Sequence, residues 1–191
     1  MSEKVRPLAS AARYGTVEEV RERLAVDGVN DPSDTGLPPI VAVLSNTDTE
    51  LRVAIIDELL AAGADASATT TPEGGNVLHG LLGSRQADAT EKAELLPRLI
   101  DAGADINLRD GRGWRPLAVM VKLRVQDADL GPLYDVVFGL DGLNLTEPAN
   151  EWDESVLDHA RKLRHRAALV ERIEAYLTAR GIDLPPKQGK K

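Results

Sequence analysis

The stretches LLAAGADAS (59–67) and LIDAGADIN (99–107) are near copies of one another, and they decide how this chain is interpreted. Each is an apolar run that leads into a glycine and then an Ala-Asp pair. Glycine directly after a helical run supplies the left-handed residue with which many helices end. We therefore predict that helices end near Gly63 and Gly103 and that the chain contains an internal repeat.

A second kind of segment recurs beside the first. It is a turn followed by a short apolar run, as in GLPPIVAVL (36–44), GNVLHGLLG (75–83) and GWRPLAVMV (113–121). Pro39 and Pro116 stand where the first turn of a helix tolerates a missing N–H group. We expect one buried residue at the same place in each unit, with separations of 32, 38, 39 and 40 residues; these residues are Leu8, Ile40, Leu78, Leu117 and Leu157.

These segments resemble the ankyrin repeat, a unit of about 33 residues with the signature T-P-L-H-x-A. VLHG (77–80) places His79 at the motif histidine, and DGRGWRPLA (110–118) resembles the turn and helix start. The resemblance covers about residues 5–183 and implies an all-α solenoid of five helix-turn-helix repeats with a structural role for His79. The expected repeats are 5–33, 34–70, 71–109, 110–149 and 150–183, followed by a basic flexible tail at 184–191.

The spacing is longer than the ankyrin unit. The additional residues fall at 46–50, 84–94 and 124–132, between the two helices expected in a repeat. Loop entropy grows slowly with length, so we expect long inter-helix loops there. Pro97 should lie in the first turn of its helix or kink it.

Composition limits the function classes. The chain has no cysteine, which excludes disulfides and cysteine-based zinc sites. The start has no apolar run long enough for a signal peptide, and no stretch approaches the length of a spanning helix, so we expect a cytoplasmic protein without membrane contact.

Charge is unevenly distributed. The net charge is −8, and residues 27–105 hold 14 Asp and Glu against 4 Lys and Arg, a net of −10. This acidic block argues against nucleic acid and favours a protein partner with a basic surface. The alternative is a solvated surface that only keeps the protein soluble.

The sequence contains no residue pattern that points clearly to a catalytic, phosphate-binding or metal-binding site. His159 and His165 are six residues apart, which predicts different faces of one helix, and they lack zinc-ligand spacing. GRGW (111–114) lacks the Lys-Ser/Thr ending of a phosphate loop. A carboxylate acid/base pair stays open among the many Asp and Glu. We expect no catalytic, cofactor-binding or metal-binding residues.

In ankyrin proteins the turns and the ends of the first helices form a concave binding face. Both tryptophans fall on predicted turns, and aromatic side chains often anchor interfaces. We therefore expect Trp114 to be the main anchor, although each indole could instead cover its own turn. The residues predicted for the face are Trp114, Trp152, Arg112, Tyr14, Asp34, Leu37, Asn46, Glu73, Lys122 and Glu151.

The leading interpretation is a non-enzymatic module, monomeric when free, that binds and occludes a basic surface of one protein. Inhibitors and the immunity proteins that neutralise bacterial toxins act in this way, and some small bacterial ankyrin proteins have that role. A self-associating scaffold is the second hypothesis, and an enzyme is the third.

Overall fold

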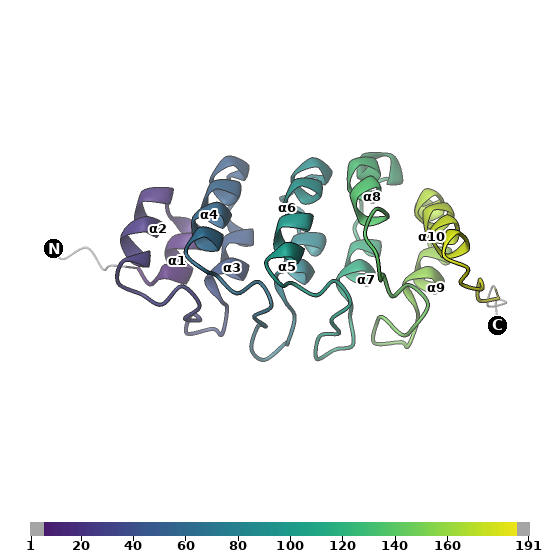
Figure 1. Ribbon diagram of the computed structural model, residues 1–191, viewed down its shortest axis with the longest axis horizontal. Helices are drawn as coiled ribbons and strands as arrows, with labels where there is room; N and C mark the ends of the chain where they lie inside the picture. Colours follow the sequence, from purple (N-terminus) through teal and green to yellow (C-terminus); the bar gives the residue numbers. More distant parts are fainter. Residues whose placement is uncertain (1–5, 187–191) are drawn as a thin grey trace.

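Residues 6–186 are described by the computed structural model, and they form five helix pairs in a row (Figure 1). We call the members of each pair the first helix and the second helix. The first helices are α1 (Leu8–Tyr14), α3 (Pro39–Ala42), α5 (Val77–Gly83), α7 (Pro116–Val121) and α9 (Val156–Arg161). The second helices are α2 (Val17–Leu24), α4 (Thr49–Ala61), α6 (Ala89–Asp101), α8 (Gly131–Val137) and α10 (Ala167–Ala179).

Three short 3-10 helices each lie between the first and the second helix of a pair: η1 (Val43–Ser45), η2 (Asp127–Leu130) and η3 (Arg164–Arg166). Within the described range the only β-structure is an isolated bridge between Pro148 and Ser155. The described part of the chain is therefore helical, and each range predicted for a repeat contains one helix pair.

The pairs stack in chain order. Each first helix packs on the first helix of the next pair, and α2 packs on α4 as α6 packs on α8. In Figure 1 the turns between pairs run along one edge of the stack, and α1 and α10 lie at its opposite ends. No helix in the described part of the chain is long and apolar enough to cross a membrane.

Local signals in the sequence explain where the helices begin. The side chain of Asp48 accepts a hydrogen bond from the backbone N–H of Leu51, and Asp88 accepts one from that of Glu91. Both satisfy an N–H group that has no partner inside its helix. Pro39 and Pro116 occupy the first turns of α3 and α7, as predicted, and Pro132 does so in α8.

The ends of three second helices share one geometry. Gly63, Gly103 and Gly181 have φ of +86°, +102° and +67°. In each case the next residue donates its N–H to the carbonyl five positions earlier; an example is Ala64 to Leu59 at 2.9 Å. This is the Schellman ending, so the predicted role of Gly63 and Gly103 is confirmed.

The turns before the first helices repeat as well. Positive φ occurs at Gly36, Gly74, Gly113 and Asp153, with φ between 55° and 86°. In the last two turns an Asx side chain organises the loop: Asp110 accepts from the N–H of Trp114, and Asn150 accepts from that of Glu154. The same backbone shape at corresponding positions shows that the units are structural repeats.

One continuous apolar core runs through the stack. The five residues predicted to be equivalent, Leu8, Ile40, Leu78, Leu117 and Leu157, are 0–2% exposed. Their burial is confirmed. Since no helix pair could bury its apolar face alone, stability must come from contacts between neighbouring pairs.

Some local predictions were wrong or were only partly decided. Pro97 lies well inside α6, which excludes the first turn and leaves the predicted kink as the remaining alternative. The segment 84–94 is not all loop, because α6 already begins at Ala89, and 124–132 contains η2 and the start of α8, so the loops between paired helices are shorter than expected. His159 lies in α9 and His165 in η3, so they do not share a helix. Residues 187–191 of the predicted tail lie outside the described residues.

Candidate functional site

An open groove crosses the first helices of four pairs. We call it the first-helix groove, and its volume is about 660 Å³. Gly80 and Gly83 line it, and a side chain on either would meet Leu44 or Val119. The residues around it come from α1, α3, α5, α7 and the adjoining loops: Arg13, Leu37, Val41, Leu44, Ser45, His79, Gly80, Gly83, Ser84, Arg85, Gln86 and Val119.

The charge of this groove differs from that of the chain. Its lining contains two arginines and no carboxylate. The first helices α1, α3, α5 and α7 hold no Asp or Glu, and α9 holds only Asp158. The acidic excess of residues 27–105 therefore lies on the second helices, the turns and the loops. The first helices in this segment do not carry it.

Cations gather where four of the first helices end, namely α1, α5, α7 and α9. A cation near a helix C-terminus interacts favourably with the helix dipole, which gives a structural reason for the position. Those with no carboxylate within ion-pair distance in residues 6–186 form a group that we call the helix-end cations: Arg13, Arg85, Lys122, Arg124 and Arg164.

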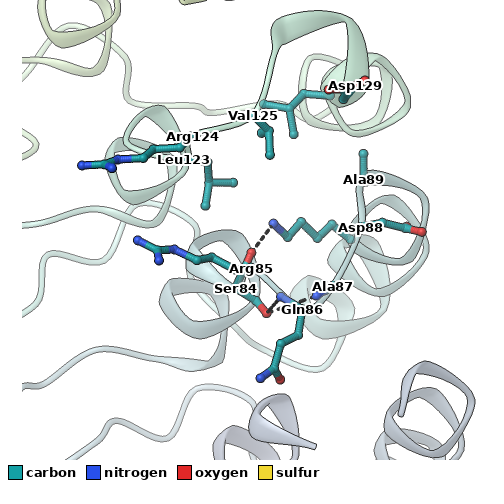
Figure 2. A pocket seen from close by; sticks show the side chains of 12 residues that line it. Ser84, Arg85, Gln86, Ala87, Asp88, Ala89, Leu123, Arg124, Val125 and Asp129 are labelled. Carbon is teal, nitrogen blue, oxygen red and sulfur yellow. Dashed lines mark hydrogen bonds between the residues drawn. The ribbon is translucent and has the colours of Figure 1, made fainter. Parts of the chain in front are cut away.

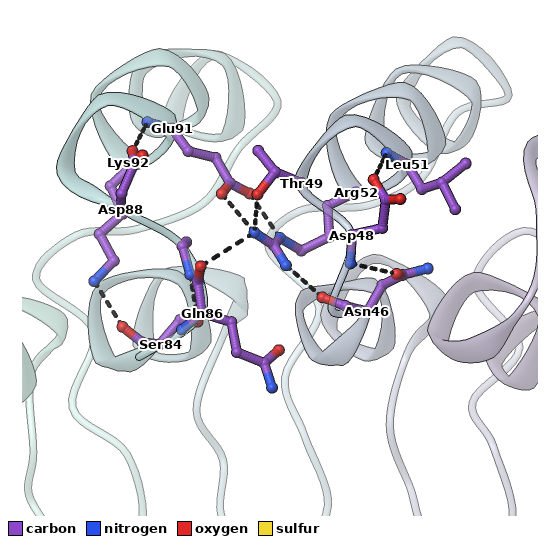
Figure 3. Close-up of polar contacts among 11 residues, drawn as sticks. Asn46, Asp48, Thr49, Leu51, Arg52, Ser84, Gln86, Asp88, Glu91 and Lys92 are labelled. Carbon is purple, nitrogen blue, oxygen red and sulfur yellow. Dashed lines mark hydrogen bonds and ion pairs between the residues drawn. The ribbon is translucent and has the colours of Figure 1, made fainter.

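Buried cations hold the loops on which these residues stand. Arg52, which is 0% exposed, bonds both carboxylate oxygens of Glu91 at 2.7 and 2.5 Å and donates to the carbonyl oxygens of Asn46 and Gln86 (Figure 3). Lys92 donates to the carbonyl oxygen of Ser84 at 2.7 Å. These bonds fix the loops that follow α3 and α5.

Arg166 does the same at the other end of the stack. It is 0% exposed and donates to the carbonyl oxygens of Val121, Leu123 and Val125. Its partner Asp127 also accepts from the N–H of Ala168, at the start of α10, at 2.8 Å. The loop after α7 is thus tied to the last pair, and Lys122 and Arg124 stand on fixed backbone.

A smaller cleft of about 430 Å³ lies between the loops that follow α5 and α7 (Figure 2). Arg85 and Arg124 both line it, and Figure 2 shows their side chains extending in the same direction. Two carboxylates, Asp88 and Asp129, also line this cleft. Since Arg85 belongs to both the cleft and the first-helix groove, the two hollows adjoin each other.

Trp114 is not the exposed anchor that the sequence predicted. It is only 5% exposed, and its ring meets that of Trp152 edge-on, with centroids 5.4 Å apart. The ring of His159 lies 5.9 Å away, and the Lys122 ammonium lies 3.8 Å above the indole. Trp114 is buried because the fifth turn and α9 cover it, so its contacts are mainly internal.

Trp152 and Tyr14 remain available. They are 60% and 63% exposed, so both keep large aromatic surfaces in solvent. Asn46 was also predicted to bind a partner, but it is 6% exposed because its carbonyl and side chain hold Arg52 and the N–H of Asp48. Of the other predicted residues, Leu37 is half-buried, and five are exposed: Arg112, Asp34, Glu73, Lys122 and Glu151.

The half-buried His79 and the buried His159 differ in their bonding. Nδ1 of His79 accepts from the N–H of Asn76 at 3.1 Å, and Nε2 donates to the carbonyl oxygen of Trp114 at 3.0 Å. Nδ1 of His159 is buried with no hydrogen-bond partner. Burial lowers the pKa of both side chains below the usual value for histidine. Both are therefore neutral at pH 7.

Sequence reasoning missed Arg85 and Arg124 as candidates. Both follow the apolar run of a first helix, so their position in the repeat was the available signal. The missing information was which carboxylates would pair with which cations. In the part of the chain that the structure covers, no group of three or more His, Asp or Glu side chains is placed to hold a metal ion.

No protein-family profile and no curated protein matches the sequence. Among solved structures, the chain is similar to a functionally unknown protein from Leptotrichia buccalis, at 24% identity and a TM-score of 0.72. The match covers 96% of this chain and 99% of that protein. It shows that the fold occurs in another natural protein, over nearly the whole length of both.

Proposed function

We propose that this chain is an ankyrin-repeat protein that binds one protein partner through its first helices and turns and occludes a surface of that partner. The observation that carries the proposal is the open first-helix groove, about 660 Å³ in volume, which crosses four helix pairs. A helical stack of this kind presents one extended surface, which suits a macromolecular partner better than a small molecule.

Two exposed aromatic residues support the same face. Tyr14 lines a hollow beside the groove, and Trp152 lies on the turn before α9. Aromatic side chains are enriched at interfaces because they bury large areas with little loss of conformational entropy. The two residues lie in the first and last pairs, so a partner that contacts both would span the stack.

We infer a cytoplasmic monomer of the inhibitor or toxin-immunity type, with no enzymatic activity of its own. The basic partner surface expected from the net charge of residues 27–105 would have to meet the turns, where Asp34 and Glu73 are exposed, or the second helices. The first helices hold one acidic residue, Asp158, so they do not complement a basic surface.

Affinity capture with the tagged full chain, followed by mass spectrometry, tests this function. We expect a partner that the Tyr14→Ala/Trp152→Ala variant no longer captures. Val26→Ala is the matched control, because Val26 is also exposed, at 75%, but follows a second helix. Capture by all three proteins, or a dimer mass by light scattering that Trp152→Ala abolishes, would contradict the proposal.

A further inference from the structure

We propose that the first-helix groove takes an acidic segment of the partner protein in an extended conformation. This inference rests on the proposed function and names the chemistry of the partner at that site. It departs from the expectation based on total charge, under which a chain of net charge −8 selects a basic partner.

The two faces of the stack differ in how their cations are paired. On the second helices, cations are neutralised by carboxylates of neighbouring helices: Arg21 of α2 pairs with Glu58 of α4 at 2.6 Å, and Arg172 of α10 pairs with Asp135 of α8 at 2.7 Å. Arg98 of α6 likewise pairs with Asp57 of α4. These arginines of the second helices are therefore neutralised by carboxylates of the same chain.

The helix-end cations have no such neutralisation. Within residues 6–186 none of the five has a carboxylate within ion-pair distance, and the first helices beside them supply almost none. Arg13 also has a buried Nε with no hydrogen-bond partner. Arg13 and Arg85 both line the groove, which contains no carboxylate. An acidic ligand would supply the negative charge that these cations lack within residues 6–186.

The spacing of the helix-end cations is compared with that of side chains along an extended polypeptide. Packed helices lie about 8–10 Å apart, so the cations that follow α5, α7 and α9 recur at about that interval, whereas no cation follows α3. An extended polypeptide rises about 3.3 Å per residue, so every third side chain of a bound strand advances by about 10 Å. A segment with Asp or Glu at every third position therefore matches the helix-end cations that follow neighbouring first helices.

The residues between the cations favour a polypeptide over nucleic acid. Leu37, Val41 and Val119 are half-buried in the groove and can receive apolar side chains that lie between the carboxylates. Single-stranded nucleic acids are usually held by aromatic rings on which the bases stack. The groove lining has no Trp, Tyr or Phe, so it has no such platform.

The experiment measures fluorescence anisotropy of a labelled peptide with the repeat Glu-Thr-Val, roughly twelve residues long so as to span about 40 Å. The full chain is titrated at low ionic strength, about 20 mM, where electrostatic attraction is least screened. We expect saturable binding that weakens steeply with salt. The comparison probes are the Lys-Thr-Val peptide and an oligothymidylate of the same length.

Two double variants with the same change in net charge separate the faces. Arg85→Glu/Arg124→Glu should weaken binding of the Glu-Thr-Val peptide by about tenfold or more, because a direct charge contact becomes a repulsion. Arg21→Glu/Arg172→Glu, on the second helices, should change it by no more than about twofold. Matching thermal melts for both variants would show that the fold is retained.

Three outcomes would overturn the inference: no binding of the Glu-Thr-Val peptide at low salt, equal weakening by both variants, or equal affinity for the oligothymidylate. Binding of the Lys-Thr-Val peptide alone would also overturn it, in favour of a basic partner at the turns. None of these results bears on the capture experiment with Tyr14 and Trp152, so failure of the inference and failure of the proposed function are distinguishable.

Discussion

Nε2 of His79 donates a hydrogen bond to the backbone carbonyl oxygen of Trp114, 3.0 Å away and 35 residues later in the chain. The bond joins the start of α5 to the turn before α7, so it links the third pair to the fourth. The carbonyl can only accept, which assigns the proton to Nε2 and leaves Nδ1 to accept from Asn76. The neutral imidazole of His79 is thus part of the contact between the third and fourth helix pairs.

This bond predicts acid sensitivity. Burial lowers the folded-state pKa of His79 below its unfolded value, so the unfolded chain binds more protons between the two. The stabilisation by neutral His79 is complete above an unfolded pKa of about 6.5 and is lost as pH falls through the folded pKa. The difference in unfolding free energy between wild type and His79→Gln should therefore shrink from pH 7 to pH 5.

Urea unfolding of both proteins at several pH values measures that difference. Carboxylates and His159 titrate in both proteins, so their contributions cancel in the comparison. A gap between the two proteins that stays constant over this range would mean that His79 contributes through packing alone.

The buried pair Arg52–Glu91 should be strongly coupled (Figure 3). Removing one member leaves the other charged and unpaired in the interior, so we expect Arg52→Met and Glu91→Leu each to cost about 3–5 kcal/mol. The double variant should cost clearly less than the sum of the two, because neither charge remains.

Chemical denaturation of the four proteins in this cycle gives the coupling energy. Additive losses would show that Arg52 acts only through the carbonyl oxygens of Asn46 and Gln86, to which it also donates. The pair joins α4 to α6, so loss of stability from either single change should extend to the neighbouring helix pairs.

The parts of the fold that depend on local signals could be predicted from the sequence. Gly63 and Gly103 marked helix ends, Pro39 and Pro116 marked helix starts, and the register of Leu78 and its equivalents gave the core, because each of these depends on residues close in the chain. The start of α6 was misplaced because Asp88 acts as an N-cap in a segment that otherwise reads as polar loop.

The site was less predictable because it depends on contacts between distant residues. Trp114 is covered by Trp152 and His159, which lie 38 and 45 positions further along the chain, so its burial could not be read from its own turn. The net charge of a segment likewise does not show which face carries it. The helix-end cations can be recognised only from the structure. It shows that Arg21, Arg98 and Arg172 pair with carboxylates, whereas Arg85 and Arg124 have none within ion-pair distance in residues 6–186.

The two tryptophans should respond differently to substitution. Trp114→Ala removes a buried indole and should cost about 3–5 kcal/mol of unfolding free energy. Trp152→Ala loses the edge-on contact of a mostly exposed ring and should cost about 1 kcal/mol.

Fluorescence provides an independent check through single-tryptophan proteins. In Trp152→Phe the remaining Trp114 should emit at shorter wavelength and resist acrylamide quenching, whereas in Trp114→Phe the remaining Trp152 should be quenched readily. Equal quenching of the two proteins would contradict the burial of Trp114.

Lys92 offers a prediction at alkaline pH. Its side chain is 2% exposed, and burial lowers the pKa of its amine to about 8, although Glu91 and Asp88 act in the opposite direction. The folded pKa lies below the unfolded value of about 10.4, so the unfolded chain binds more protons between them.

The penalty for burying the charged amine of Lys92 is present in full below pH 8 and is relieved as pH rises toward 10. Wild type should therefore gain on the order of 1–2 kcal/mol of stability relative to Lys92→Met between pH 7.5 and pH 10. Denaturant unfolding of both proteins across this range measures the gain, and tyrosines titrate alike in the two, so they cancel. Parallel curves would show that the amine stays charged in the folded protein, held by Ser84 and the two carboxylates.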